Sequence, residues 1–324
     1  MPKISVIIPN YNGRQFLETC LSSLTKQTYT DFETILVDDA STDESLPFVR
    51  TYYPDAEIIS LTKNVGFASA VNRGIKQAKG QYIALLNNDT ETDKDWLAEL
   101  NLALDTHKDV GFCASLMIDY NNRNMVDCAG IGFSSWGRAY KRGSGQVARQ
   151  FKQPSFIFGA SAGAAMYRKT LFEKIGLFDE DFWAFFEDVD LSFRAQLAGF
   201  KCLYVPQAIV YHIGTASHDK KSVKLRYTGY RNKQWVIFKN YPAYYLFKYY
   251  FKYGLSEMKT ILTDFKEGFF LSPFIANWLI CKDLPKLFKK RIAVQRLRTV
   301  SLHYLDSIID KSYYELKRIT NNRR

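Results

Sequence analysis

Three groups of carboxylates follow apolar segments of this chain, a placement typical of a site for a charged ligand. Asp89 follows the apolar run 82–86, and the pair 38–39 follows the run 34–37. A third group, Glu-Asp-Val-Asp, occupies residues 187–190. Open α/β sheets bind substrates at the carboxyl ends of parallel strands, and Mg²⁺ often bridges carboxylates to substrate phosphates. The sequence therefore predicts a metal-assisted reaction on a charged, phosphorylated substrate.

Asp89 is the first candidate metal ligand, because Mg²⁺ and Mn²⁺ prefer oxygen donors. An Asx turn or a helix cap explains an Asp at this position equally well. The amide oxygen of Asn87 can also coordinate a metal, although Asn in a turn is usually structural. His212 ends the strand-like run 208–211 after the acidic group, which favours a functional role, whereas a lone His is more often structural.

Asp38 and Asp39 close a predicted strand, where an acceptor-only side chain can recognise the base or ribose of a nucleotide. The alternative is capping of the next helix, for which residues 41–43 are better suited. Arg73 can pair with a phosphate, and a solvated arginine on a helix face fits its position equally well. These residues are consistent with a nucleotide site, and also with a helix cap and a solvated arginine.

Asp188 is the candidate general base, because a base must be an accessible carboxylate near a hydroxyl. Glu187 and Asp190 lie at the same predicted helix start, where carboxylates are also common caps. Asp190 is spaced to pair with Arg194 at i+4. Three aromatic residues that can wall a ligand ring precede the group: Trp183, Phe185 and Phe186.

Short strands and helices alternate over the first 106 residues and must position these groups. Strands are predicted at 4–9, 32–37, 57–61 and 82–86, and helices at 14–26, 42–53, 68–79 and 96–106. This alternation predicts an α/β fold with a mostly parallel central sheet covered on both faces.

The middle of the chain is less regular. A buried strand is predicted at 110–118, a long functional loop at 120–150, a helix at 188–198 and a strand at 201–205 that ends at Pro206. The run 159–165 is composed of Gly, Ala and Ser, so a ligand can approach its backbone closely. Long helical segments begin at Arg226.

The net charge of +11 is distributed unevenly over the 324 residues. Residues 1–217 hold 21 Lys+Arg and 25 Asp+Glu, a net −4, whereas residues 218–324 hold 23 and 8, a net +15. An anionic partner is therefore expected for the C-terminal third. The five scattered cysteines indicate a reducing compartment. We expect no signal peptide and no transmembrane helix.

The basic third also mixes aromatic residues with lysines. Residues 244–253 interleave the two, and the apolar stretch 269–280 precedes a lysine-rich segment, 282–291. This composition is typical of a segment that lies on an anionic membrane leaflet. A helical packing or dimerisation module is the alternative, and RNA binding is a third reading. We expect a membrane surface and no nucleic acid as the partner.

Six motifs in order resemble family 2 of the inverting glycosyltransferases over residues 3–240. They are residues 5–12, 37–43, 64–74, 86–90, 186–191 and His212. The resemblance implies a GT-A catalytic domain at 1–225, with a nucleotide-sugar half at 1–110 and an acceptor half at 111–225. Residues 226–324 are then a basic, aromatic helical extension.

The resemblance also implies roles for matching positions. Asp188 matches the catalytic base and Glu187 its partner, while Asp89 and His212 match metal ligands for Mg²⁺ or Mn²⁺. Asn87 stands where the family's Asp-x-Asp motif has its first Asp. The residues implied for the nucleotide sugar are Pro9, Tyr11, Asp39, Arg73, Asn87 and Asn88.

The implied reaction moves a sugar from a nucleoside diphosphate to an acceptor hydroxyl in one inverting displacement. The Asn-Asn-Asp-Thr motif at 87–90 is similar to a branch rich in rhamnosyltransferases of bacterial surface polysaccharides. Acceptors in that branch are often carried on polyprenyl diphosphate, so we expect a cytoplasmic enzyme, peripheral on the inner face of the plasma membrane. A homodimer is one further expectation. The alternatives are a non-catalytic binding protein of the same fold and a nucleotidyltransferase.

Overall fold

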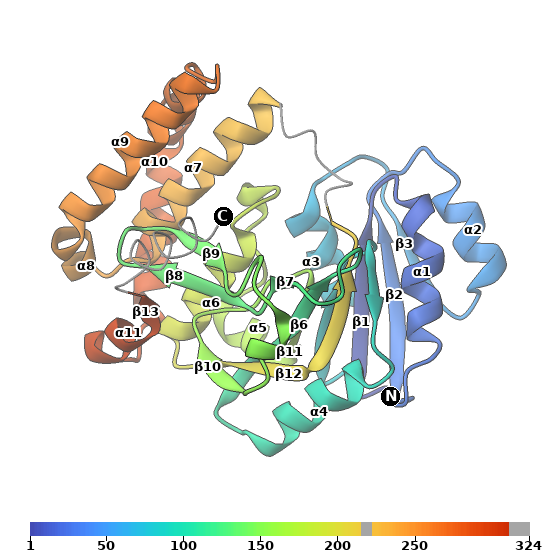
Figure 1. Cartoon of the computed structure of the whole chain (residues 1–324). Coiled ribbons are helices and arrows are strands. Elements are labelled where there is room, and N and C mark those ends of the chain that lie inside the picture. The colour runs from blue at the N-terminus through green and yellow to red at the C-terminus, as the bar shows by residue number, and fades with distance from the viewer. Residues whose placement is uncertain (215–221, 311–324) are drawn as a thin grey trace. The chain divides into compact units, whose positions relative to one another are not determined.

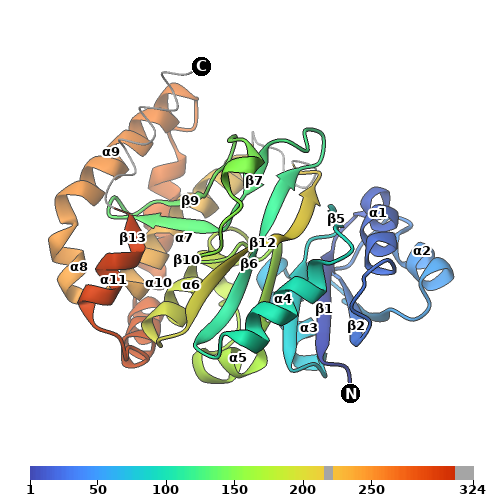
Figure 2. The ribbon, with the colours of Figure 1, turned by 60° about the horizontal axis from the view of Figure 1, so that its bottom comes forward.

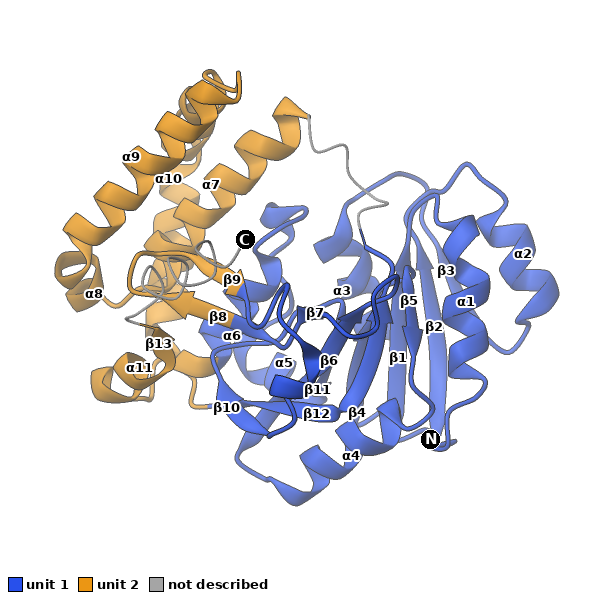
Figure 3. Ribbon diagram, viewed as in Figure 1, with its two compact units in different colours: residues 1–131, 141–195, 200–217 blue, residues 132–140, 196–199, 218–324 orange. Residues whose placement is uncertain are grey.

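The computed structural model describes residues 1–214 and 222–310. The chain forms two compact units (Figure 3). Unit 1 comprises residues 1–131, 141–195 and 200–217, and unit 2 comprises 132–140, 196–199 and 218–324. The segments 132–140 and 196–199 thus group with the C-terminal third. The predicted functional halves of the catalytic domain stay a prediction.

A sheet of ten described strands forms the centre of unit 1 (Figure 1). Its main path runs β10-β12-β6-β11-β4-β1-β2-β3, with β5 paired to β12 and β7 to β6. The strands are β1 (Ile4–Asn10), β2 (Phe32–Asp38), β3 (Glu57–Ser60), β4 (Tyr82–Leu86), β5 (Thr90–Thr92), β6 (Val110–Asp119), β7 (Val126–Cys128), β10 (Ser155–Ile157), β11 (Ala164–Arg168) and β12 (Lys201–His212).

The sheet is mixed and mostly parallel, as predicted. β3, β2, β1 and β4 are mutually parallel neighbours, and β12 is parallel to β6. β11 is antiparallel to both β4 and β6, so these two strands point the same way across it. The carboxyl ends of β1, β2, β4, β6 and β12 therefore lie along one edge of the sheet, where ligands bind in open α/β folds.

Helices cover both faces of this sheet (Figure 2). They are α1 (Arg14–Leu24), α2 (Ser45–Tyr52), α3 (Phe67–Gln77), α4 (Trp96–Thr106), α5 (Lys169–Ile175) and α6 (Glu187–Leu197), with short 3₁₀ turns η1 (Ala148–Gln150) and η2 (Glu180–Phe182). Successive side chains of a strand point to opposite faces of the sheet. On one face, Val6 of β1 packs in the core cluster with residues of α1, α2 and α4. On the other face a Cβ at Gly74 of α3 would lie 2.5 Å from Ile7, so only glycine allows this close approach.

Three predicted elements need correction. The predicted loop 120–150 contains β7, β8 (Ile131–Ser134), β9 (Ala139–Lys141) and η1. The strand predicted to end at Pro206 continues to His212, because a register shift between Val205 and Ile209 places the proline in an irregularity of the pairing. The helix predicted at 42–53 begins at Ser45 and ends at Tyr52 as α2.

Unit 2 is mainly helical. Its helices are α7 (Val223–Asn240), α8 (Ala243–Lys248), α9 (Tyr250–Lys266), α10 (Ser272–Arg296) and α11 (Leu302–Ile308). Strand β13 (Ile309–Asp310) pairs with β8, which also neighbours β9 in a three-stranded sheet. The long helices predicted after Arg226 are therefore present. Within the described ranges, no helix combines the length and the apolar composition that crossing a membrane requires.

Candidate active site

Asp39 anchors the loop that follows β3. Its two carboxylate oxygens accept hydrogen bonds from the backbone N–H groups of Val65 at 2.7 Å and Gly66 at 2.9 Å. The side chain is buried, and burial raises its pKa while the two N–H donors oppose that rise. Each oxygen keeps a lone pair for a further donor, so Asp39 can still bind a ligand such as a nucleobase.

The neighbouring Asp38 binds residues of the fold itself and has a structural role. It is fully buried, and it accepts hydrogen bonds from Nδ2 of Asn10 at 2.9 Å and from the N–H of Ser41 at 3.0 Å. Oδ1 of Asn10 in turn accepts a hydrogen bond from Nδ2 of Asn88 at 2.7 Å. This network joins the carboxyl ends of β1, β2 and β4, and it brings the predicted residue Asn88 to the same edge as Asp39.

The remaining predicted nucleotide-sugar residues lie on the same half of the sheet. Pro9 lies near the carboxyl end of β1, and Tyr11 follows that strand with its side chain exposed. Arg73 is exposed on α3, and in the described ranges no hydrogen bond or ion pair joins it to another predicted site residue. Asn87 lies at the end of β4, where its N–H donates to the carbonyl of Gly163 at 2.9 Å.

Asp89 and His212 meet at the carboxyl ends of β4 and β12. Oδ1 of Asp89 is buried, and no donor in the described part of the chain hydrogen-bonds to it. Nε2 of His212 lies 3.5 Å from this oxygen, and Nδ1 of the same ring lies 3.0 Å from Oδ2 of Asp127. A carboxylate that holds one ring nitrogen of a histidine and leaves the other for a cation is a common arrangement around protein-bound metals.

The charges around His212 are consistent with such a cation. Burial would lower the pKa of His212, but the carboxylates of Asp127 and Asp89 outweigh it and raise the pKa to about 9. Burial likewise opposes ionisation of Asp127, but His212 and Lys141 lower its pKa to about 2. Two carboxylates thus stabilise a positive charge on one imidazole. A metal ion would supply that charge in place of the proton.

The donor set fits a divalent cation with few protein ligands. No group of three or more His, Cys, Asp or Glu side chains positioned for a metal occurs in residues 1–214 and 222–310. Mg²⁺ is often held by one or two carboxylates while substrate phosphates and waters complete its coordination. The orphaned oxygen of Asp89 beside Nε2 of His212 suits such a site.

Asp127 and Lys141 did not emerge from the sequence. Lys141 Nζ lies 2.9 Å from each carboxylate oxygen of Asp127, and its charge also acts on Asp188. The available signal was local: Val126 and Cys128 are buried on either side of Asp127, which is the alternation of a half-buried strand. The interpretation of 120–150 as a loop obscured it.

Glu187 and Asp188 begin α6, after a segment in which three residues other than glycine have a positive φ. Trp183, Phe185 and Phe186 have φ of 60°, 67° and 69°. Such conformations cost on the order of 1–3 kcal/mol each and concentrate at functional sites. Here they set the position at which the two carboxylates enter the helix.

Both carboxyl groups are difficult to ionise. Burial raises the pKa of Glu187, and the adjacent carboxylate of Asp188 raises it further. Burial also raises the pKa of Asp188, while hydrogen bonds from the N–H groups of Val189 and Ala162 and the charge of Lys141 oppose this. Oε2 of Glu187 has no hydrogen-bond partner within the described ranges. Asp188 is therefore the member of the pair that ionises first.

The third acidic residue of this helix has a structural partner, as the i+4 spacing predicts. Asp190 is fully buried, and its Oδ2 accepts a hydrogen bond from Nε of Arg194 at 2.9 Å. Arg194 also donates to the carbonyls of Ile175, Gly176 and Leu177. This pair ties α6 to the end of α5.

The small-residue run 159–165 connects the two parts of the site. The carbonyl of Gly163 accepts the hydrogen bond from Asn87, and the N–H of Ala162 donates to Oδ2 of Asp188 at 3.4 Å. A Cβ at Gly163 would lie 3.1 Å from Nδ2 of Asn87. The run thus lets the Asn87–Asp89 turn and the start of α6 approach each other, whereas close approach of a ligand to its backbone stays a prediction.

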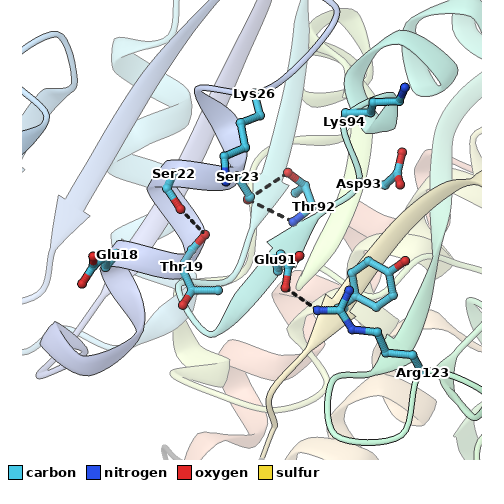
Figure 4. A pocket seen from close by; sticks show the side chains of 11 residues that line it. Glu18, Thr19, Ser22, Ser23, Lys26, Glu91, Thr92, Asp93, Lys94 and Arg123 are labelled. Carbon is cyan, nitrogen blue, oxygen red and sulfur yellow. Dashed lines mark hydrogen bonds and ion pairs between the residues drawn. The ribbon is translucent and has the colours of Figure 1, made fainter.

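A cavity of ≈ 490 Å³ lies beside β5 and α1 (Figure 4). Among its lining residues, Arg123 and Glu91 form an ion pair at 2.6 Å, and Ser23 and Thr92 form a hydrogen bond. None of the predicted catalytic, nucleotide-sugar or metal residues lines it. It is therefore separate from the arrangement described above.

The family model described as Glycosyl transferase family 2 matches residues 5–176. This range contains the strand-end motifs of Asp39 and Asp89, and it ends before the acidic group of α6. The match agrees with the resemblance that the sequence motifs indicate.

Two curated proteins and one solved structure illustrate the similarity. The uncharacterized glycosyltransferase EpsJ of Bacillus subtilis is 31% identical over 60% of this chain and 56% of its own length. The O-antigen biosynthesis protein RfbC of Myxococcus xanthus is 27% identical over 75% of this chain and 20% of its own. The mannosyltransferase PcManGT of Pyrobaculum calidifontis, solved with GDP-Man and Mn²⁺, shares the fold at 18% identity with a TM-score of 0.54, over 90% of this chain and 86% of its own. This chain thus spans little more than half of EpsJ and a fifth of RfbC.

Proposed function

This chain belongs to glycosyl transferase family 2, and we propose that it transfers a sugar from a nucleoside diphosphate to an acceptor hydroxyl with inversion. The observation that supports the proposal most is the contrast between two acidic sites of one unit. Asp89 faces His212 in an arrangement suited to a cation, while Asp188 has a raised pKa suited to accepting a proton. A metal-dependent inverting transfer would use both properties.

The metal side would bind the diphosphate of the donor. Asp89 and His212 would hold Mg²⁺ or Mn²⁺, and Asp127 would fix the orientation of the imidazole through Nδ1. When bound, the cation supplies positive charge that stabilises the departing diphosphate. Asn87 replaces the first acidic residue of the usual motif, so this site provides one carboxylate fewer.

The donor nucleotide would bind along the carboxyl ends of β1, β2 and β4. Asp39 would accept a hydrogen bond from the base, with Pro9 and Tyr11 as apolar walls. Asn88, fixed by Asn10, and Asn87 would face the sugar diphosphate. Arg73 is exposed on α3 and would pair with a phosphate only if its side chain extends toward the donor.

Asp188 would remove the proton of the acceptor hydroxyl while the sugar carbon is attacked from the face opposite the diphosphate. The hydroxyl oxygen forms the new bond, the bond to the diphosphate oxygen breaks, and the proton ends on the carboxylate. Glu187 would stay protonated because its pKa is raised, so Asp188 would be the member of the pair that acts as the base. No covalent intermediate with the protein is needed.

The acceptor is proposed to be a glycan or a polyprenyl-linked sugar in surface polysaccharide synthesis. The relative RfbC is named for O-antigen biosynthesis. Rhamnose as the sugar depends on the Asn-Asn-Asp-Thr motif alone. A lipid-linked acceptor would place the enzyme at the cytoplasmic face of the plasma membrane.

A panel of nucleotide sugars tests the proposal. Saturation-transfer NMR and thermal shift in Mn²⁺ should select one nucleotide, and donor turnover with a sugar acceptor should follow. Selective binding without turnover, in the presence of glycan and lipid-linked acceptors, would favour the non-catalytic alternative. Release of pyrophosphate from a nucleoside triphosphate and a sugar phosphate would favour a nucleotidyltransferase.

A further inference from the structure

Helix α9 exposes apolar residues and buries polar ones, which reverses the usual pattern of a surface helix. Its large apolar side chains are between 51% and 82% exposed: Phe251, Leu255, Met258, Leu262 and Phe265. They recur at spacings of three and four residues, so they share one face of the helix. We call this face the α9 stripe.

The opposite face of α9 is held by polar contacts within unit 2. Asp264 is buried and forms an ion pair with Arg226 of α7 at 2.6 Å. Glu257 pairs with Lys233 of α7, and Oγ of the buried Ser256 accepts a hydrogen bond from Nε of Arg138. Rotating the helix to bury the stripe would leave Asp264 and Glu257 without their cations. These contacts therefore fix the stripe outward.

Helix α10 presents a second apolar face, the α10 stripe. Its large apolar members are 50–63% exposed and recur near helical spacing: Phe274, Trp278, Phe288 and Ile292. Cys281 lies on the same face and is exposed. The other side of α10 buries Ala276, Leu287 and Val294, so the stripe is not the packing face of this helix.

Lysines accompany both stripes. Lys252, Lys259 and Lys266 are exposed at a spacing of seven residues, which keeps them along one edge of the α9 stripe. Lys282 and Lys289 are exposed in the same way beside the α10 stripe. Residues 250–296 contain nine Lys+Arg and four Asp+Glu. Two of those four are Glu257 and Asp264, which are already paired on the buried face.

We propose that the α9 and α10 stripes form a docking surface for an anionic lipid bilayer. Large apolar side chains that are at least half exposed and grouped on two helix faces are typical of an interaction site. Aromatic and aliphatic residues edged by lysines suit the boundary between lipid headgroups and acyl chains. A second copy of this chain would bring rows of lysines together, whereas anionic lipids neutralise them. This lipid binding does not depend on the proposed sugar transfer. Only the idea that the bilayer brings a lipid-linked acceptor to the enzyme rests on the proposed function.

Cys281 provides a native probe of this surface. The other cysteines, Cys20, Cys113, Cys128 and Cys202, are buried, and burial raises the pKa of their thiols. A polarity-sensitive fluorophore will therefore label Cys281 in the folded chain.

Vesicles of phosphatidylcholine with about 30% phosphatidylglycerol should shift the emission to the blue, and pure phosphatidylcholine should shift it little. The control places the dye on Leu102→Cys in a Cys281→Ser background, because Leu102 is 60% exposed on α4. An unchanged spectrum at Cys281, or an equal shift at both positions, would overturn the proposal.

Vesicle flotation of the full chain tests the electrostatic and the apolar contributions to lipid binding separately. Changing Lys252, Lys259 and Lys266 together to Gln should lower the lipid partition coefficient by about 10- to 100-fold and reduce its salt dependence. The matched control changes the exposed lysines Lys63, Lys108 and Lys152 to Gln and should retain binding.

The apolar component is tested by Leu255→Gln with Leu262→Gln, which should lower partition on the order of tenfold or more. Leu102→Gln is the control for an equally exposed leucine. Failure of the wild-type chain to float with anionic vesicles, or a stable dimer that the two leucine changes dissociate, would contradict the proposal. An active but non-floating enzyme would contradict it without affecting the proposed function.

Discussion

The group around His212 and the pair at the start of α6 use the same residue type in opposite electrostatic settings. Asp127 lies against His212 and Lys141, and its pKa falls to about 2. Glu187 and Asp188 are adjacent to each other in a buried position, and both pKa values rise. The first setting stabilises a fixed negative charge, whereas the second favours a carboxyl group that can take up a proton.

This contrast explains how one unit can offer a cation site and a base close in the fold. Neighbouring cations favour ionised carboxylates, while burial and a neighbouring carboxylate disfavour them. Lys141 acts on both regions, since it pairs with Asp127 and its charge moderates the rise at Asp188. The assignment of metal ligand and base therefore depends on neighbours rather than on residue type. Substitutions at these carboxylates test that dependence.

The largest effect is expected at Asp89. Asp89→Ala removes the carboxylate whose Oδ1 lies beside Nε2 of His212, so it should abolish detectable turnover and weaken Mn²⁺-dependent diphosphate binding. Turnover assays and calorimetry with nucleoside diphosphate provide the measurements. The exposed Asp55→Asn serves as the control. Full activity of the wild-type chain in excess EDTA would refute the metal assignment.

Asp188→Asn should lower turnover by roughly 10²–10⁴-fold, because the side chain keeps its shape and loses its basicity. Affinity for the nucleotide sugar should persist, since Asp188 lies on the acceptor side of the proposed site. Single-turnover kinetics and donor titration separate the two quantities. If Glu187→Gln loses turnover while Asp188→Asn retains it, the pair is assigned the wrong way round.

Asp127→Asn should have a smaller effect. It removes the carboxylate that holds Nδ1 of His212, and such outer partners typically account for about 10- to 100-fold in metal affinity. A Mn²⁺ titration of activity and of bound metal by electron paramagnetic resonance should show weaker binding, with turnover recovered at high Mn²⁺. Unchanged Mn²⁺ affinity would separate Asp127 from the metal site.

The pH profile of activity tests the raised pKa of the pair at the start of α6. The base form of Asp188 accumulates as the pH rises through its raised pKa, so kcat/KM should fall about tenfold per pH unit below that value. The residual activity of Asp188→Asn should lack this limb. A wild-type profile that stays flat down to the ordinary pKa of a carboxyl group would contradict an elevated pKa at this pair.

The smallest effect concerns stability. The native state holds protons on Glu187 and Asp188 more tightly than the unfolded chain, because their native pKa values are raised. Their contribution to the free energy of unfolding should therefore decline as pH rises from the ordinary carboxyl pKa through the raised values. Relative to wild type, Glu187→Gln should gain stability on the order of 1–3 kcal/mol over that window. Denaturant unfolding at several pH values measures this, and a pH-independent difference would argue against it.

The sequence predicted much of the fold because its signals there are local. The strand 82–86 and the helix 96–106 occur with the predicted bounds, since apolar periodicity decides both. The strand-end positions of Asp39, Asp89 and His212 follow from the same local order. The pairing of Asp190 with Arg194 was predictable from helical spacing.

Other features depend on contacts that local order does not encode. Asp127 reaches His212 across 85 residues of sequence, so no spacing rule brings the two together. β12 continues past Pro206 because its pairing with β6 tolerates an irregularity there.

The sequence by itself determined the family, the order of the strand-end carboxylates and the basic C-terminal third, because each is written in neighbouring residues. Only the tertiary structure decided which carboxylates gain cationic partners and which side of α9 faces outward. Ion pairs such as Arg226 with Asp264 join distant segments and fix the rotation of that helix. Electrostatic environment and helix orientation are properties of packing, so they exist only once the chain has folded.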